Sequence, residues 1–440
     1  MKKIIKVFSF LFVFILTCSV FLTGCKPKNS SEGQEKYTFN RDYLFGMCDP
    51  SGSLGGGVDK AITNEWLGDV SDVMGIKSFR LWVSLDGNLG GLFNVDIENN
   101  LTFNQAYLAK VHDFVDNLKR GGVENFLFLP TCFLYPYGSA CTGFDVPDPN
   151  DNEDEYLGFL QIMAKAYAMM SREFPEIKNW ETGNEPDLHG SGMHKPGYTP
   201  GASTVVNNNY IYNNEELAYI IADMSWYIRR ALKEVNEENR VALPGLSLAY
   251  DADGEFFEAI YTGIESKKLP FGTEKSDIDP DNYFDILDWH PYCDGNATST
   301  PITDERWEEW KELAISYHDI AARHGDADKP AYFSEFGWTD RGETDVFDAI
   351  AVNYEKGLTI IRDEMPWVEV VFCFRVTNLV HQKASDFGTE ENFGLFYSPD
   401  DSLYPGRAKP AAKAITNFFN VSGSEHFKDF DWLEEKYSNK

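Results

Sequence analysis

Short apolar segments alternate with longer amphipathic segments along most of the chain, and this alternation restricts the possible folds more than any other feature. The apolar segments have the length and composition of strands, and they lie at Tyr43–Gly46, Ile76–Val83, Asn125–Pro130, Lys178–Thr182, Arg240–Gly245, Phe284–His290, Ala331–Glu335 and Val368–Phe374. Apolar residues at helical spacing predict helices at Asn104–Arg120, Asp154–Phe174, Asn214–Val235, Asp304–His324, Thr344–Asp363 and Ala408–Phe419. This eightfold alternation predicts the α/β class and, within it, a (β/α)8 TIM barrel.

The chain is longer than such a barrel requires, because a typical (β/α)8 barrel has about 250 residues and this chain has 440. The extra residues fall in long segments after the third, fourth, sixth and eighth predicted strands, at Leu134–Asn152, Asp187–Asn213, Asp294–Thr303 and Thr377–Pro405. Each segment leads from a strand to a helix. Such loops lie at the carboxyl end of a barrel, where the active sites of TIM-barrel enzymes are found.

The alternative α/β architecture is an open, doubly wound sheet. A chain of that kind usually has a glycine-rich phosphate-binding turn after its first strand. The segment Gly52–Gly57 is rich in glycine but does not have the GxGxxG spacing, so it is weak evidence for a nucleotide site. We therefore expect a barrel.

The first 25 residues are typical of an export signal. Three lysines among the first six residues precede an apolar stretch, Val7–Val20, which is followed by the tetrad Leu22–Cys25. A positive start, an apolar stretch and small residues at a cleavage site indicate a secretory signal, although the stretch is almost long enough for a membrane-spanning helix. The tetrad resembles the lipobox of bacterial lipoproteins. This resemblance implies that Cys25 is lipidated and anchors an exported protein at the cell surface.

These signals divide the chain into four parts. Residues 1–24 are the expected lipoprotein signal peptide, and the polar residues 25–40 are expected to form a flexible tether. The barrel is expected at 41–425, and residues 426–440 are left as a C-terminal tail.

The charge of the chain argues against two kinds of partner. Its 70 acidic and 39 basic residues give a formal net charge of −31. Nucleic acids bind to basic patches, and an anionic membrane surface attracts basic segments. We therefore expect no nucleic-acid partner and no membrane contact except through the N-terminal lipid. The sequence has no signal that fixes an oligomeric state.

The cysteines and acidic residues do not indicate a metal site. Beyond Cys18 and Cys25, the cysteines are scattered without a CxxC zinc-binding pair, at positions 48, 132, 141, 293 and 373. A disulfide between Cys132 and Cys141 and a pair of buried free thiols both stay open for an exported protein. The acidic segment Asp148–Glu155 lacks the central glycine of an EF-hand loop. We expect no metal.

Two glutamates lie at the ends of predicted strands, in segments that are otherwise apolar. Glu185 follows the fourth strand and Glu335 ends the seventh. The carboxyl ends of these strands can face each other across the mouth of a small barrel, where partial burial tunes the pKa of a carboxyl group. Glycoside hydrolysis with retention of configuration uses two carboxyl groups about 5–5.5 Å apart. The alternative is a pair of structural carboxylates that cap neighbouring loops.

Four motifs occur in the order that is found in glycoside hydrolase clan A. They are Arg80 at the end of the second strand, Asn184-Glu185-Pro186 after the fourth, His290-Pro291-Tyr292 at the end of the sixth and Glu335 at the end of the seventh. The chain therefore resembles this clan of retaining (β/α)8-barrel glycosidases. The cellulase-like family 5 and the β-xylosidase-like family 39 both share parts of these motifs.

The resemblance implies a role for each motif residue. Glu185 is expected to be the general acid and base, and Glu335 the nucleophile that forms a glycosyl-enzyme. Asn184 is expected to bind the 2-hydroxyl of the sugar, a contact that strengthens in the transition state. Tyr292, by donating a hydrogen bond, and Arg80, by its charge, are expected to keep Glu335 ionised.

Other parts of the expected site are less directly implied. His290 is expected to orient the polar groups around it, and its alternative is a structural histidine under the loop. Many clan members have a tryptophan at the end of the eighth strand, where this chain has Phe374, and a histidine at the end of the third, where it has Thr131 and Cys132. We expect Phe374, Trp338 and Trp82 to offer surfaces on which a sugar ring stacks.

Together, these features predict a retaining glycoside hydrolase that cleaves β-glycosidic bonds in extracellular poly- or oligosaccharides, without a metal or an organic cofactor. The acidic surface suits a neutral carbohydrate and repels polyanions. Two alternatives come from other functional classes. One is a barrel lipoprotein that binds carbohydrate without cleaving it. The other is a solute-binding lipoprotein of a sugar transporter, which would have two α/β lobes.

Overall fold

The computed structural model describes residues 41–49, 64–86, 91–96, 100–131, 144–188, 192–197, 208–247, 251, 254–270, 277–294, 297–378, 392–397, 401, 403–419 and 429–438. All of them belong to one compact unit, Phe39–Lys440. The expected signal peptide, Cys25, the tether, Cys132 and Cys141 lie outside the described residues. Within the described part of the chain, we find no helix with both the length and the apolar composition that a membrane crossing requires.

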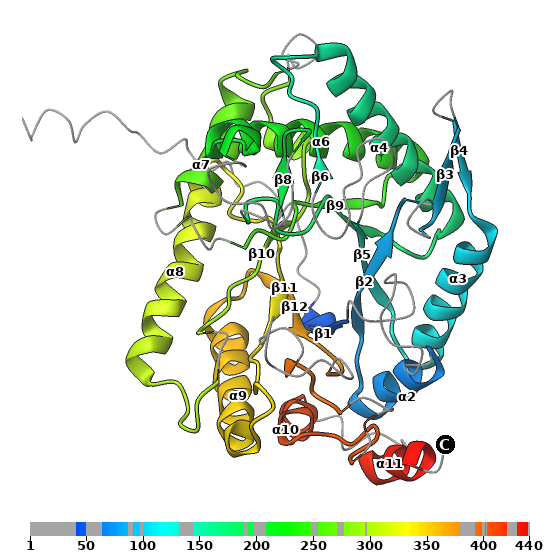
Figure 1. Cartoon of the computed structure of the whole chain (residues 1–440). Helices are drawn as coiled ribbons and strands as arrows, with labels where there is room; N and C mark the ends of the chain where they lie inside the picture. Colours follow the sequence, from blue (N-terminus) through cyan, green and yellow to red (C-terminus); the bar gives the residue numbers. More distant parts are fainter. Residues whose placement is uncertain are drawn as a thin grey trace, which may run out of the picture. The chain divides into compact units, whose positions relative to one another are not determined.

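Eight parallel strands form the central sheet, and neighbouring strands pair in the order β10-β11-β12-β1-β2-β5-β7-β9 (Figure 1). Their bounds are β1 (Phe45–Cys48), β2 (Ser78–Ser84), β5 (Asn125–Thr131), β7 (Asn179–Glu181), β9 (Arg240–Ala242), β10 (Leu287–Trp289), β11 (Ala331–Phe336) and β12 (Val368–Phe374). Bridges from Ala242 to Ile286 and from Leu246 to Trp289 join the β9 and β10 segments and close the barrel. The (β/α)8 TIM barrel is confirmed, and it differs from the two lobes expected of a solute-binding protein.

Helices surround the barrel (Figure 1). They are α2 (Asn64–Met74), α3 (Gln105–Arg120), α4 (Glu153–Glu173), α6 (Asn214–Val235), α7 (Glu255–Glu265), α8 (Asp304–Arg323), α9 (Phe347–Glu364) and α10 (Pro410–Phe418). The segment 426–440, which we separated as a tail, contains α11 (Phe430–Ser438). This helix packs on α2, where the hydroxyl of Tyr437 donates to Asp69 Oδ2 at 2.7 Å.

Polar caps fix the beginnings of four of the predicted helices. The side chains of Asn104, Asn152, Asn213 and Thr303 accept hydrogen bonds from backbone N–H groups in the first turns of α3, α4, α6 and α8. Such bonds satisfy N–H groups that have no partner within the helix. The caps explain why these helices begin within one residue of their predicted positions.

Apolar side chains fill the barrel and separate it from the helices. Leu127, Ala242, Ile286, Tyr332 and Val370 belong to the inner cluster. A larger cluster lies between the strands and the helices. Because successive side chains of a strand point to opposite sides, strands such as β5 and β9 contribute to both clusters. Polar residues on the inner side of a strand face one another across the barrel.

Short strands connect the loops at the carboxyl end. β3 (Phe93–Val95) and β4 (Leu101–Phe103) form a hairpin in the segment between β2 and α3. β6 (Phe144–Asp145) pairs with β8 (Met193–His194), so the loops after β5 and β7 are joined. These loops are two of the long segments that the sequence predicts at the carboxyl end.

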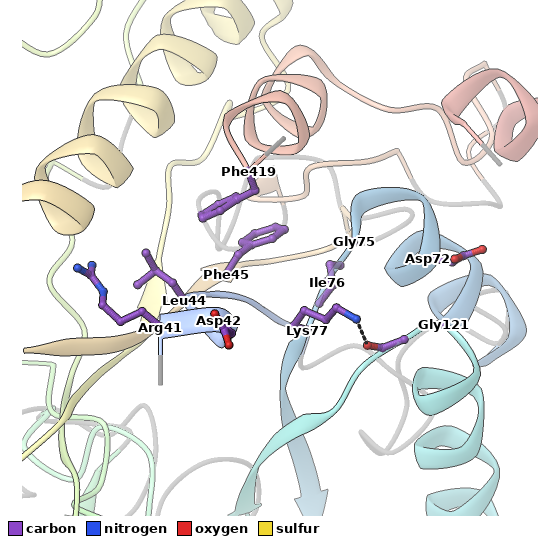
Figure 2. Close-up of a pocket in the computed structure, with 11 residues that line it drawn as sticks. Arg41, Asp42, Leu44, Phe45, Asp72, Gly75, Ile76, Lys77, Gly121 and Phe419 are labelled. Carbon is purple, nitrogen blue, oxygen red and sulfur yellow. Dashed lines mark hydrogen bonds between the residues drawn. The ribbon is translucent and has the colours of Figure 1, made fainter. Parts of the chain in front are cut away.

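A pocket of about 320 Å³ lies at the amino end of β1, on the side away from those loops (Figure 2). Phe45 and Phe419 stack in its wall with ring centroids 4.8 Å apart. Arg41 donates to two backbone carbonyls of α9, and Lys77 Nζ donates to the carbonyl of Gly122 at 3.3 Å. The charged groups of this pocket therefore hold chain segments together.

Candidate active site

Arg80, which we placed at the end of the second strand, lies near the middle of β2, because this strand continues to Ser84. It is the centre of a buried polar cluster in the carboxyl half of the barrel. Its Nε and Nη2 donate to the two carboxylate oxygens of Glu181 at 2.7 and 2.6 Å. Nη1 donates to Glu335 Oε1 at 2.7 Å, and Nη2 also donates to Asn184 Oδ1 at 2.8 Å. A planar guanidinium can serve several acceptors at once in this way. The structure therefore brings together three of the predicted site residues.

Glu335 is held as a carboxylate from two sides. The hydroxyl of Tyr292 donates to its Oε2 at 2.7 Å, opposite the bond from Arg80 to Oε1. Burial by itself would raise the pKa of Glu335, but the charges of His290 and Arg80 and the hydrogen bonds from Tyr292 and Arg80 lower it below the ordinary value. Both contacts that we predicted for this glutamate, from Arg80 and from Tyr292, are present.

Glu185 is held in a different environment. Its φ of 43° lies in the left-handed region, where a residue other than glycine is strained by about 1–3 kcal/mol, and its N–H donates to the carbonyl of Gly245 at 2.8 Å. The side chain is 21% exposed. Burial raises the pKa of Glu185 above its ordinary value, and the charges of Glu335 and Asp187 act in the same direction.

His290 lies between the two glutamates. Its Nδ1 is 2.9 Å from Glu185 Oε1 and 3.7 Å from Glu335 Oε2. Burial alone would lower the pKa of this imidazole, but the charge of Glu335 and the contact with Glu185 raise it above the ordinary value. The position fits the orienting role that we predicted.

Glu185, His290 and Glu335 each have a ligand atom within 4.8 Å of the others, so the three side chains could also hold a metal ion. The guanidinium of Arg80 already contacts Glu335 and would repel a cation bound there. The same geometry places one oxygen of each carboxyl group within 4.8 Å of the other. Such a short separation is typical of retaining glycosidases.

Gly245 allows this cluster to form. A Cβ atom at this position would lie 2.3 Å from His290 Nε2, 2.7 Å from Ser334 Oγ and 3.0 Å from Glu181 Oε1. The N–H of Gly245 donates to Glu181 Oε1 at 3.0 Å. Only a residue without a side chain leaves room for the three polar groups that converge here.

Sequence reasoning assigned no role to Glu181 or Asp288, which are both fully buried. Glu181 bonds to Arg80 through both oxygens. Burial, together with the charge of Glu181, raises the pKa of Asp288 well above its ordinary value. The available signal was an acidic residue inside an apolar strand, in Trp180-Glu181-Thr182 and in Leu287-Asp288-Trp289.

Two of the predicted stacking residues lie at the barrel mouth. The indole of Trp82 is partly buried, and its Nε1 donates to Cys48 Sγ at 3.2 Å. Phe374 packs against Phe393 with ring centroids 5.4 Å apart, and Phe393 also contacts Tyr292. Phe393 therefore extends the aromatic wall beside Tyr292 and Glu335, a position that we did not predict for it.

The prediction for Trp338 was wrong. Its indole is 1% exposed and packs against Phe336 and Tyr354 in the layer between the barrel and the helices. Its Nε1 donates to the backbone carbonyl of Cys293 at 2.7 Å. A ring that is buried and bonded in this way offers no surface to a sugar.

The sequence matches no protein-family model and no curated protein. The fold, however, is similar to that of solved glycosidase structures. A family 39 glycoside hydrolase from the gut symbiont Bacteroides cellulosilyticus WH2 is 16% identical with a TM-score of 0.53, and the match covers 86% of this chain and 64% of that one, just under two thirds of its length.

Two further structures are matched over almost their whole length. The family 5 xyloglucanase from Paenibacillus pabuli is 14% identical with a TM-score of 0.54, and the match covers 86% of this chain and 99% of that one. The family 1 β-glucosidase from Thermotoga maritima is 13% identical with a TM-score of 0.52 and coverages of 89% and 99%. At these identities the likeness concerns the fold, and the chain has the (β/α)8 fold of glycoside hydrolases of families 39, 5 and 1.

Proposed function

We propose that this protein is a retaining glycoside hydrolase that cleaves β-glycosidic bonds, with Glu335 as the nucleophile and Glu185 as the general acid and base. One observation carries the proposal. Two carboxyl groups lie with oxygens within 4.8 Å of each other, and their pKa values are displaced in opposite directions. A double displacement requires one carboxylate that stays ionised and a neighbour that keeps its proton. The shared fold with known glycosidases supports this assignment.

In the first step, Glu335 attacks the anomeric carbon while Glu185 protonates the oxygen of the leaving group. The attacking oxygen becomes part of an ester, so the charge of Glu335 disappears. Arg80 and Tyr292 donate hydrogen bonds to this carboxylate before the attack. They stabilise its negative charge again when the ester breaks. Asn184, whose amide oxygen is held by Arg80, has its NH2 group fixed as the donor for the 2-hydroxyl.

In the second step, Glu185 removes a proton from the water that attacks the glycosyl-enzyme. The charge of Glu335 helps to raise the pKa of Glu185 in the free protein. Formation of the ester removes that charge, so the pKa of Glu185 falls and the carboxylate becomes available as a base. The short distance between the two glutamates therefore links the pKa of Glu185 to the charge of Glu335.

The proposed substrate is a neutral β-linked poly- or oligosaccharide. A net charge of −31 repels polyanionic polysaccharides. Substrate tests begin with β-glucosides, β-xylosides and xyloglucan, because the structural neighbours include a β-glucosidase and a xyloglucanase and because the motifs resemble those of the β-xylosidase-like family 39.

The test combines three variants with this substrate panel. We expect the protein to cleave at least one member, and we expect Glu335→Gln to abolish cleavage. Glu185→Ala should also be slow, and azide should restore its turnover because this anion attacks the anomeric carbon of the glycosyl-enzyme without a general base, which releases the carboxylate of Glu335 and forms a glycosyl azide. Glu369→Gln is the matched control, since Glu369 is a buried carboxylate that pairs with Arg240 in the amino half of the same barrel.

Each result has a definite meaning. Loss of activity in both site variants, with azide rescue of Glu185→Ala alone, supports the assigned roles. Binding of a polysaccharide without cleavage by the unchanged protein would instead favour a carbohydrate-binding barrel. Full activity of Glu335→Gln would contradict the proposal.

We also propose that the protein is exported and anchored at the cell surface by a lipid on Cys25. The support is the lipobox-like tetrad after a positive and apolar stretch. Cys25→Ser should move the protein from the membrane fraction and remove the mass of the lipid. An unchanged membrane fraction with no lipid mass on the wild-type protein would contradict this proposal.

A further inference from the structure

An apolar pocket of about 340 Å³ lies directly beside Glu185. One wall is a face of α8, where Trp310, Leu313, Ala314 and Tyr317 line the pocket at the i, i+3, i+4 and i+7 positions of a helix. The opposite wall comes from the segments that follow β7, β9 and β10. We call this cavity the aglycone pocket for the reason given below.

The pocket borders Glu185 but not Glu335. Glu185, His290 and Tyr292 are among the residues that line it, whereas Glu335 is not. In the proposed reaction the general acid lies beside the oxygen of the leaving group, and the nucleophile approaches from the opposite face of the sugar ring. A pocket that touches only the acid is therefore on the leaving-group side.

Most polar atoms of the described lining already have partners. Trp310 Nε1 donates to the carbonyl of Pro291 at 2.6 Å, and Ser247 Oγ donates to Asp187 Oδ2 at 3.1 Å. The hydroxyl of Tyr317 donates to a backbone carbonyl. A sugar in this pocket would lose the hydrogen bonds of its hydroxyls to water and find few replacements, which disfavours its binding.

Two buried nitrogens of the lining, Trp289 Nε1 and His290 Nε2, have no hydrogen-bond partner among the described residues. His290 Nε2 faces Gly245. Both nitrogens are buried, so neither adds a donor that a ligand in the pocket could reach. The lining therefore does not match the several hydroxyls of a second sugar.

We propose that the leaving group of the substrate is an apolar aromatic alcohol, bound in the aglycone pocket, so that the substrate class is aryl β-glycosides. This inference rests on the proposed function and narrows it, because it replaces a sugar on the leaving-group side by an aromatic ring. The size is sufficient, since an apolar cavity of about 150 Å³ can hold a benzene molecule and this pocket is more than twice as large. Aromatic walls favour flat aromatic groups through stacked and edge contacts.

The test uses substrates that share one sugar and differ in the leaving group. They are glycosyl fluorides, which have no aglycone, and phenyl and 2-naphthyl β-glycosides, whose alcohols are of similar acidity, each as the glucoside and the xyloside. The unchanged protein should prefer the naphthyl over the phenyl compound, because the larger ring buries more apolar surface. Binding of free 2-naphthol, followed by fluorescence, measures the pocket without catalysis.

A matched pair of variants assigns the effect to the pocket. Leu313 lines it and is 43% exposed, whereas Val352 on α9 is 46% exposed and lies outside the lining. Leu313→Glu should lower kcat/KM for the naphthyl glycoside and weaken 2-naphthol binding by about tenfold, because it places a charge at the edge of an apolar site. Val352→Glu adds the same charge and should change neither. Val352→Glu should hydrolyse the glycosyl fluoride at the wild-type rate, and Leu313→Glu should lose less activity on the fluoride than on the naphthyl glycoside.

The outcomes separate this inference from the proposed function. Equal effects of Leu313→Glu and Val352→Glu, or no naphthyl preference, would overturn the aryl-glycoside proposal while fluoride hydrolysis left the glycosidase assignment intact. If the unchanged protein hydrolyses no fluoride or glycoside of any sugar in the panel, the proposed function fails and the inference fails with it. A loss in Leu313→Glu that is larger for the naphthyl glycoside than for the fluoride, and that is absent in Val352→Glu, supports both.

Discussion

Two arginine–carboxylate groups lie inside the same barrel, and the comparison between them shows what separates a structural ion pair from a site. In the amino half, Arg240 donates to both oxygens of Glu369 at 3.2 and 2.7 Å and links β9 to β12. In the carboxyl half, Arg80 serves Glu181 and Glu335 at once. Arg240 therefore contacts one carboxylate, whereas Arg80 contacts two.

The excess of carboxylates at the carboxyl end has chemical consequences. With Glu185 and Asp288 nearby, the carboxyl groups outnumber Arg80, and the pKa values of Glu185 and Asp288 rise while that of Glu335 falls. Cavity size does not make this distinction, since the pocket beside β1 and the aglycone pocket have volumes of about 320 and 340 Å³. The excess of buried carboxyl groups over arginine therefore identifies the site better than the volume of a pocket does.

Replacement of the two arginines by lysine should give the largest contrast. Arg80→Lys cannot keep bonds to Glu181, Glu335 and Asn184 together, and we expect kcat/KM to fall by about 100- to 1,000-fold. Loss of donors to the carboxylate should raise the pKa of Glu335, so the acidic limb of the pH profile should move to higher pH.

Arg240→Lys is the control for that variant. It should lower the melting temperature and leave kcat/KM and the acidic limb unchanged. The comparison breaks down if Arg240→Lys is as inactive as Arg80→Lys while both proteins keep the circular dichroism spectrum of the wild type.

A methyl group at Gly245 should produce the next largest effect. In Gly245→Ala the added Cβ would meet His290 Nε2 and Ser334 Oγ, so these groups must shift, at a cost of about 1–3 kcal/mol in stability. We expect activity to fall by about tenfold or more, because a displaced His290 no longer aligns Glu185.

Gly325 provides the control at the other end of the barrel. It precedes β11, its φ is 94°, and a Cβ there would have no atom within 4 Å. Gly325→Ala should cost about 1 kcal/mol through backbone strain without an effect on kcat. Thermal unfolding and steady-state kinetics of the two variants measure both quantities, and equal losses of activity would refute the interpretation.

A smaller and more specific effect is expected from Asp187. Its carboxylate accepts bonds from the N–H and hydroxyl of Ser247, and its charge helps to raise the pKa of Glu185. Asp187→Asn removes the charge, so the pKa of Glu185 should fall and the alkaline limb of kcat/KM should move to lower pH. Asp285→Asn, in the amino half, should not move this limb. A shift to higher pH in Asp187→Asn would show that another group is the acid.

The sequence patterns predict the barrel well because its elements carry local signals. All eight strands lie where their apolar segments indicate, and capped helices begin where an Asn or Thr precedes an amphipathic stretch. The helices that we did not predict lack such signals. α2 is buried on almost every side, and α7 follows Gly254, an N-cap residue that has a φ of 72° and offers no side-chain cap. α11 has only nine residues.

The site is predictable only to the extent that strand ends determine it. Glu185, Glu335 and Tyr292 follow or end strands, so the order of the strands brings them together. Glu181 depends on a partner 101 positions away, and no local pattern shows that bond. Trp338 lies two residues beyond β11, where the alternation of the strand no longer fixes the side of the barrel to which a ring points.

The smallest expected effect comes from Cys48, which tests where the site ends and the barrel core begins. Its buried thiol accepts hydrogen bonds from Trp82 Nε1 at 3.2 Å and Arg80 Nη1 at 3.7 Å. Burial raises the pKa of this thiol to about 12, so it is a neutral acceptor at pH 7. The shorter side chain of Cys48→Ser loosens both contacts, and we expect kcat to fall by about two- to fivefold.

Cys373 is the matched control, because it is paired in register with Met47 on the neighbouring strand but packs in the outer cluster. Cys373→Ser puts a hydroxyl into that apolar layer, so it should lower the melting temperature and leave kcat unchanged. If Cys48→Ser lowered kcat no more than Cys373→Ser, the thiol of Cys48 would only fill space in the core and would not help to position Arg80. The cluster that positions Glu335 would then be limited to the middle of β2 and the ends of β7, β10 and β11, and β1 would contribute nothing to it.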